Sequence, residues 1–122
     1  MTSDFEHLRL RTKDFAIRTV KLVEALPTSM PGRRLGDQLL RAACSVGANY
    51  RAACRARSRN DFVAKLAIVE EEADECVYWL EIITEVGLMR ETKTRELHKE
   101  AKELVAIVSA SRITARKNGR ST

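Results

Sequence analysis

The sequence has few of the residues that interrupt helices, with two Pro and five Gly among 122 residues. Aromatic residues are also scarce, at 5%. The three Cys form no C-x-x-C pair, and an odd count does not suit a disulfide framework. No apolar run approaches the roughly 20 residues that span a bilayer. These absences argue against a disulfide-stapled domain and against a membrane protein, and they favour helix throughout.

The residues of common enzyme chemistry are missing as well. Only two His are present, and neither lies beside a Ser or Cys nucleophile motif. There is no Gly-rich phosphate-binding loop. The acidic run from Glu70 to Glu75 lacks the Glu-x-x-His pairs that a di-iron bundle needs. We therefore expect no enzyme activity, no cofactor and no metal site.

The composition is that of a soluble domain with a charged surface. Apolar residues make up 44% and charged residues 32% of the chain, and the length corresponds to one domain. The N-terminal stretch MTSDFEHLRLRTKDF carries charges from its start, unlike a signal peptide. Because the Cys residues are also expected to be reduced thiols, the sequence predicts a cytoplasmic protein.

Apolar residues recur at alternating three- and four-residue steps along four segments, which is the pattern of helices that bury one face. Thr2 or Ser3 is expected to cap the first helix, and Ser58 the third. The segment Pro27–Gly32 predicts a loop, and Gly87 is placed to end a helix in a left-handed conformation. The predicted helices cover residues 4–26, 34–56, 59–86 and 93–115, followed by a basic tail at 116–122. Short connections between them predict a single-domain, all-α, antiparallel up-down four-helix bundle.

The third predicted helix is apolar on two faces, so it needs more than one packing partner. One face is expected in the core. The second face consists of Ile68, Trp79, Ile82 and Val86, and we predict that it forms a subunit interface. The alternative is that Trp79 only caps the edge of the bundle.

Two polar residues, Gln38 and Asn49, lie within the second predicted helix, which is rich in Ala and Leu. Polar side chains that are buried are almost always hydrogen-bonded. We therefore predict structural roles for both residues.

Charge is distributed unevenly along the chain, whose net charge is +5. Residues 33–59 carry seven Arg and one Asp, whereas residues 60–86 carry eight acids and one Lys. Most arginines of the first block fall within an arc of roughly 100° on a helical wheel. Two interpretations stay open: a basic stripe for nucleic acid, or pairing, within or between subunits, with acids of the third helix such as Glu70, Asp74, Glu81 and Glu85.

The bases near the C-terminus have no acidic counterpart of their own, so they are the better candidates for contacts with phosphates. Arginines of the second helix that remain unpaired would add to them. The predicted nucleic-acid-binding residues are Arg34, Arg41, Arg51, Arg55, Arg112, Arg116, Lys117 and Arg120.

Three segments, QLLRAACSVGAN at 38–49, SRNDF at 58–62 and EEADECVYWLE at 71–81, resemble the four-helix-bundle proteins of intervening sequences in 23S ribosomal RNA genes. The resemblance extends from Phe5 to about Val108. Its most specific part is the spacing of Gln38, Arg41, Ala42, Ser45 and Asn49. The family usually continues with Ile-Ala-Glu-Gly, where this chain has Tyr-Arg-Ala-Ala, so a role tied to that Glu or Gly does not carry over.

Members of this family resemble closed homopentamers. The accessory proteins of diversity-generating retroelements are similar in fold, and they bind nucleic acid and a reverse transcriptase. The resemblance therefore implies a homo-oligomer, and a pentamer first of all. It leaves two hypotheses about function open. One is a non-enzymatic accessory protein that binds RNA or DNA nonspecifically. The other is an oligomeric scaffold that binds a protein partner and no nucleic acid.

Overall fold

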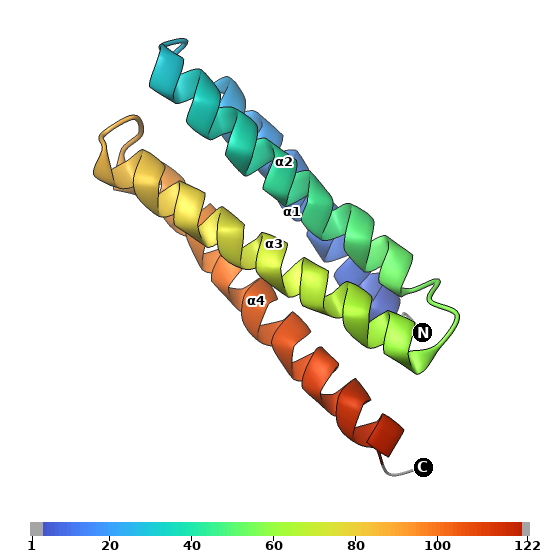
Figure 1. The fold of residues 1–122 in the computed structure, drawn as a ribbon. Coiled ribbons are helices and arrows are strands. Elements are labelled where there is room, and N and C mark those ends of the chain that lie inside the picture. Colours follow the sequence, from blue (N-terminus) through green and yellow to red (C-terminus); the bar gives the residue numbers. More distant parts are fainter. Residues whose placement is uncertain (1–3, 121–122) are drawn as a thin grey trace.

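The computed structural model describes residues 4–120, and the side chains of residues 4–118. Helix α1 spans Asp4–Glu24, α2 spans Met30–Ala53, α3 spans Arg59–Glu85 and α4 spans Glu91–Arg120. Successive helices run in opposite directions, so the start of α1 and the end of α4 lie at the same end of the molecule (Figure 1). The predicted antiparallel up-down bundle is therefore confirmed. The cap predicted at Thr2 or Ser3 lies outside the described residues.

The connection between α1 and α2 is shorter than predicted, because α2 begins at Met30 instead of at residue 34. Ser29 caps the helix, and its hydroxyl accepts a hydrogen bond from the Gly32 amide at 3.2 Å. Pro31 is tolerated in this first turn because backbone N–H groups there have no partner within the helix. A Cβ at Gly32 would collide with the carbonyl of Pro27, so the position needs glycine. Because Pro27 and Pro31 predicted a loop up to Gly32, the sequence did not reveal this first turn of α2.

The bounds of α1 and α3 and the start of α4 lie within two residues of the prediction, whereas the ends of α2 and α4 differ by more. Ser58 caps α3, and its hydroxyl accepts a hydrogen bond from the Asp61 amide at 3.0 Å. Gly87 has a φ of 80°, the left-handed conformation expected after α3. Helix α2 ends at Ala53, before the predicted residue 56. Helix α4 continues to Arg120, so the predicted basic tail is helical up to that residue, in keeping with the helix propensity of Arg and Lys.

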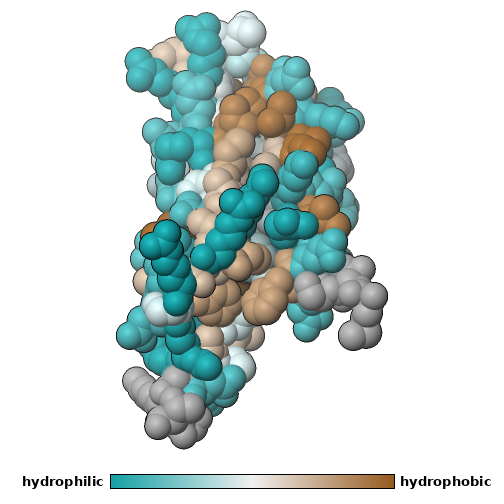
Figure 2. Space-filling view, turned by 90° about the vertical axis from the view of Figure 1, so that its right-hand side faces the viewer, coloured by the Kyte–Doolittle hydropathy of each residue, from teal (hydrophilic) through white to brown (hydrophobic). Residues whose placement is uncertain are grey.

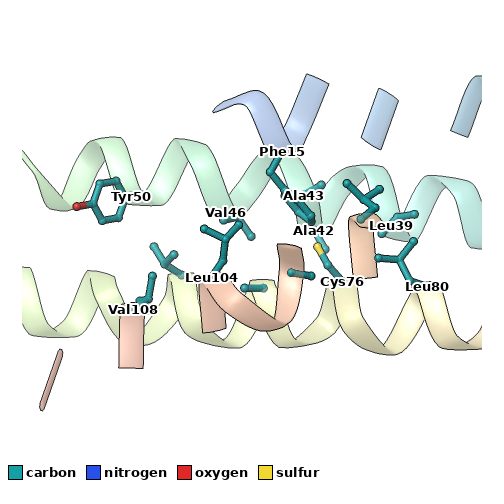
Figure 3. Close-up of a cluster of buried hydrophobic side chains, with 14 of the residues drawn as sticks. Phe15, Leu39, Ala42, Ala43, Val46, Tyr50, Cys76, Leu80, Leu104 and Val108 are labelled. Carbon is teal, nitrogen blue, oxygen red and sulfur yellow. The ribbon is translucent and has the colours of Figure 1, made fainter. Parts of the chain in front are cut away.

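The core runs along the bundle and is built from one face of each helix. On α2 this face is mostly small, with Ala42 and Ala43 fully buried, which lets neighbouring helices approach closely. Figure 3 shows side chains of α3 and α4 meeting this face of α2. Burial of one large apolar side chain contributes about 1.5–3 kcal/mol. The large, fully buried apolar side chains are Phe15, Leu39, Leu66, Leu80, Ile83 and Leu104.

Helices α1 and α4 contact each other less than the other neighbouring pairs do. A charge cluster joins them: Nε and Nη2 of Arg11 each donate to a carboxylate oxygen of Glu100 at 2.8 Å. Nη2 also donates to Glu103 at 2.8 Å. The hydrogen bond from Arg11 is the main reason that the pKa of Glu100 lies below its usual range, although partial burial opposes the shift. A charge cluster thus helps to hold α1 against α4 on the fourth side of the bundle.

Candidate nucleic-acid interface

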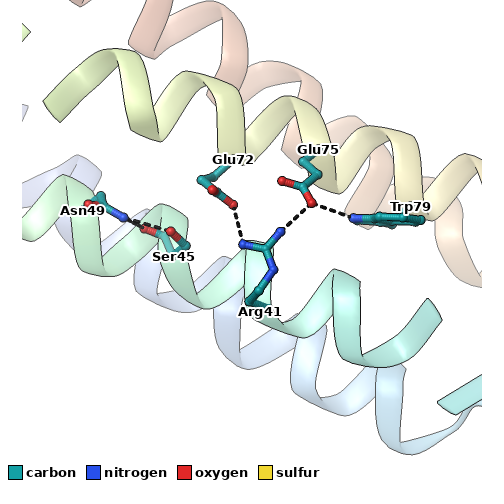
Figure 4. A network of polar contacts seen from close by, with 6 residues as sticks. All are labelled: Arg41, Ser45, Asn49, Glu72, Glu75 and Trp79. Atoms are coloured by element: carbon teal, nitrogen blue, oxygen red, sulfur yellow. Dashed lines mark hydrogen bonds and ion pairs between the residues drawn. The ribbon is translucent and has the colours of Figure 1, made fainter. Parts of the chain in front are cut away.

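Arg41, the central member of the predicted basic stripe, is engaged within the subunit (Figure 4). Its guanidinium donates to Glu72 at 3.2 Å and also to Glu75 of α3. The same Glu75 oxygen accepts a hydrogen bond from the Trp79 indole at 3.1 Å. Partial burial of Glu75 disfavours its charge, but the hydrogen bonds from Arg41 and Trp79 outweigh it and lower its pKa. For Arg41, pairing with the third helix is the interpretation that the structure supports.

Arg112 is engaged as well, because its Nε donates to Glu70 of α3 at 2.9 Å. The acids of α3 that pair with α2 are Glu72 and Glu75, which lie outside the acidic arc considered from the sequence. Glu70 turns toward α4. Oε2 of Glu81 lies 2.8 Å from Nε2 of His98, which also belongs to α4. Within the subunit, Glu70 and Glu81 therefore do not pair with the arginines of α2. The rotation of α3 about its own axis directs these two acids toward α4 instead.

The other predicted nucleic-acid-binding residues remain exposed. Within the described side chains they form no ion pair, and they keep their charge available to a ligand. The side chain of Arg120 lies outside the described residues. The exposed members of the set are Arg34, Arg51, Arg55, Arg116 and Lys117.

Most of these cations gather at one end of the bundle, where α2 and α4 end and α3 begins (Figure 1). We call this the basic end and define it by Arg55, Arg57, Arg59, Arg116 and Lys117, all of them exposed. Arg59 donates to the Ala115 carbonyl at 3.4 Å, which ties the start of α3 to α4. The arginines of the α2–α3 connection and the bases of α4, far apart in sequence, thus contribute to one surface.

An open pocket of about 650 Å³ lies at the basic end, between the start of α1 and the last turns of α4. Phe5 and Phe62 line it and form an edge-to-face pair with ring centroids 5.8 Å apart. Its polar lining consists of Ser111, Thr114, Asn118 and Arg59 together with one acid, Asp4. Apart from that carboxylate, the pocket places aromatic rings and polar side chains beside the cations, a combination that suits a flexible polyanion.

A second basic surface was not predicted from the sequence. A groove of about 440 Å³ runs between α1 and α2, and we call it the α1–α2 groove. Small residues, among them Ala16, Cys44, Gly47 and Ala48, line it, with Leu10 beside them and the cations Arg9, Lys13 and Arg51 around them. Figure 2 views the molecule from this side and shows a hydrophobic band crossed by hydrophilic side chains. The groove depends on two helices together, so periodicity within either helix alone could not reveal it.

The four residues of the predicted subunit interface differ in exposure. Ile68 is 42% and Val86 is 60% exposed, whereas Trp79 and Ile82 are half-buried. Trp79 packs partly against the core, and the ring of Tyr78, itself 54% exposed, meets it edge to face at 5.0 Å. The predicted interface did not include Tyr78, because this residue falls outside the apolar stripe formed by the other four. The interface itself stays a prediction.

The two predicted structural residues lie in different surroundings. Asn49 is half-buried, and its amide donates to the Ser45 carbonyl at 2.9 Å and to the Ser45 hydroxyl at 2.8 Å. Gln38 is exposed, so burial gives it no structural role within the subunit. For both residues the structural role stays a prediction. For Gln38 such a role would require a contact with a partner molecule.

Among the described residues, no group of three His, Cys, Asp or Glu side chains is placed to hold a metal ion. No helix in this part of the chain is both long and apolar enough to cross a membrane. The candidate site is therefore built from exposed cations and the two open hollows beside them.

The architecture defines an antiparallel up-down four-helix-bundle protein with a strongly charged surface. Residues 8–110 match the model of the 23S rRNA-intervening sequence protein family, and the chain belongs to this family. A solved structure of a protein of unknown function from the S23 ribosomal protein family of Bacteroides thetaiotaomicron VPI-5482 is similar, with 30% identity and a TM-score of 0.78. The similarity covers 84% of this chain and 94% of that chain. A comparison with curated proteins gave no match.

Proposed function

We propose that the protein is a non-enzymatic, oligomeric accessory protein that binds RNA or DNA nonspecifically through its basic end. The observation that carries the proposal is the exposure of Arg55, Arg116 and Lys117 at one end of the bundle, with no ion pair within the described residues. Clustered cations bind a phosphate backbone by releasing its condensed counterions, and they read no sequence. The aromatic pair in the adjoining pocket offers a surface for unpaired bases.

Oligomerisation and a cytoplasmic location belong to the same proposal. Exposed Ile68 and Tyr78 on α3, and Val86 directly after it, support a subunit contact, since exposed large apolar side chains that lie together mark interaction sites. The family resemblance makes a homopentamer the expected assembly. Three free thiols, Cys44, Cys54 and Cys76, suit a reducing compartment.

Salt-dependent binding tests the nucleic-acid role. We expect fluorescence anisotropy with a labelled DNA duplex to show an affinity that falls linearly with salt on logarithmic axes. Arg116→Gln with Lys117→Gln should flatten that slope by up to about 1.8, because each phosphate that the protein no longer neutralises reduces the slope by about 0.9. The matched control is Arg90→Gln with Lys93→Gln, which removes the same charge at the opposite end of the bundle. It should leave the slope nearly unchanged.

A protein scaffold is the second candidate, favoured by the 54% exposure of Tyr78 and the 60% exposure of Val86. Exposed aromatic and aliphatic side chains in and directly after α3 suit a protein partner better than a phosphate backbone. If the full-length protein shows no affinity for duplex DNA or single-stranded RNA at low salt, the scaffold replaces the nucleic-acid role.

A further inference from the structure

The α1–α2 groove carries positive charge that nothing within the described residues neutralises. Its cations Arg9, Lys13 and Arg51 are exposed and form no ion pair in this part of the chain, and the groove is lined by no acid. Small side chains at Ala16 and Ala48 let another element approach closely. The groove therefore suits an elongated partner that bears negative charge.

The outer face of α3 carries the opposite charge. Glu71 and Asp74 are exposed, and within the described residues they form no ion pair. Ile68 and Tyr78 stand on the same exposed side, at 42% and 54% exposure. We call these four residues the acidic ridge. It combines two unpaired acids with two large apolar side chains on a single helix.

We propose that the acidic ridge of one copy docks in the α1–α2 groove of a second copy. The proposal rests on the oligomer of the proposed function and names the two surfaces that form it. Acids of the ridge would pair with the cations of the groove, while Tyr78 and Ile68 cover Leu10, which is 56% exposed. Complementary charge fixes the register of such a contact, and its apolar centre holds it together.

The placement of the two surfaces decides the type of assembly. The groove lies between α1 and α2, and the ridge lies on α3, so a docked copy still has one groove or one ridge free. A contact between two different surfaces is heterologous, and it adds copies until a rotation closes a ring. A symmetric dimer would instead use the same surface twice. The inferred contact therefore produces a head-to-tail assembly, and a rotation that closes after five copies would give the expected pentamer.

Charge reversal in pairs tests the contact. Arg9→Glu with Lys13→Glu makes the groove acidic, and Glu71→Lys with Asp74→Lys makes the ridge basic. We expect each double variant to lose the assembly and to show the monomer mass by light scattering at tens of micromolar. The quadruple variant restores opposite charges and the original net charge, so it should recover most of the wild-type mass.

Two further variants separate docking from a general effect of charge. Lys99→Glu with Lys102→Glu makes the same charge change as the groove variant at exposed positions of α4, and it should keep the assembly. Ala48→Leu fills the groove at an exposed position without entering the core, and it should weaken assembly at unchanged net charge. Circular dichroism should show an unchanged helical spectrum for all these variants.

The outcomes separate this inference from the proposed function. A monomeric wild type would overturn both the oligomer and the docking contact. An oligomer whose mass survives both charge reversals would overturn the docking contact alone. So would a quadruple variant that stays monomeric and folded, or a groove variant that loses nucleic-acid binding while it keeps the assembly.

Discussion

Arg41 of α2 and Glu75 of α3 form an ion pair within one subunit, and the Glu75 oxygen that accepts from Arg41 also accepts from the Trp79 indole. The guanidinium therefore serves the packing of α2 against α3 before it can serve a ligand. The Arg41 side chain is 50% exposed, and ion pairs of such exposure typically contribute about 0.2–1 kcal/mol. The basic stripe of α2 thus contains cations with two different roles.

The first prediction separates these roles. Arg41→Ala should lower the free energy of unfolding, measured in urea, by up to about 1 kcal/mol because Glu72 and Glu75 lose their shared cation. Arg34→Ala is the control: Arg34 is exposed and forms no ion pair within the described residues, so its removal should leave stability unchanged. An Arg41→Ala variant of wild-type stability that flattens the salt slope of DNA binding would contradict the assignment.

Acid should weaken the contact between α1 and α4. Hydrogen bonds from Arg11 lower the pKa of Glu100 in the folded state. A carboxyl with a lowered pKa adds stability above its unfolded pKa, and that stability is lost as pH falls through the folded pKa. We therefore expect the free energy of unfolding to fall as pH drops below about 4.3, the ordinary pKa of Glu.

Urea unfolding at pH 7 and at pH 3 measures this decrease. Glu100→Gln should be less stable than wild type at pH 7, but its stability should change less between the two pH values because it has no carboxyl to protonate. Glu24→Gln removes an exposed carboxyl that forms no ion pair within the described residues, and its pH dependence should match wild type. Equal pH dependence in wild type and Glu100→Gln would show that the pair with Arg11 is not formed in solution.

Periodicity predicted the bundle well because burial of one face dictates where apolar residues recur. Phe15 and Leu80 are fully buried as their stripes required, and Ser58 and Gly87 mark helix ends through local chemistry. The start of α2 was missed because Pro31 breaks a helix interior but suits a first turn, and only the Ser29 cap distinguishes the two cases.

Contacts between helices could not be predicted to the same degree. A helical wheel places Glu70 and Glu81 on one side of α3, but it does not say which neighbour that side meets, and both acids face α4. The choice depends on how far each helix is rotated about its own axis, which the whole core decides. For the same reason, one helix could not reveal that Arg9 and Arg51 share a groove.

Two glycines should respond to alanine in opposite directions. Gly87 has a φ of 80°, and a Cβ there would meet nothing within 4 Å, so Gly87→Ala should cost about 1–2 kcal/mol through backbone strain alone. Gly47 lies inside α2, and its Cβ would be 3.4 Å from the Thr12 carbonyl oxygen, an ordinary contact. Gly47→Ala should therefore raise stability by about 0.5–1 kcal/mol. Urea unfolding of both variants checks the pair, and a shift of the same sign in each would refute the account.

The predicted subunit interface can be tested with two isoleucines of nearly equal exposure. Ile68 of α3 is 42% exposed and belongs to the predicted interface, whereas Ile113 of α4 is 44% exposed and does not. In an isolated subunit, glutamate at either position should change stability by no more than about 0.5 kcal/mol, since surface substitutions rarely do more. In an assembly, Ile68→Glu would remove a large apolar side chain from the contact and desolvate a carboxylate in its apolar centre. Light scattering over a dilution series should therefore show dissociation of Ile68→Glu at concentrations where wild type and Ile113→Glu remain assembled. Equal behaviour of the two variants would place the subunit contact elsewhere on the bundle.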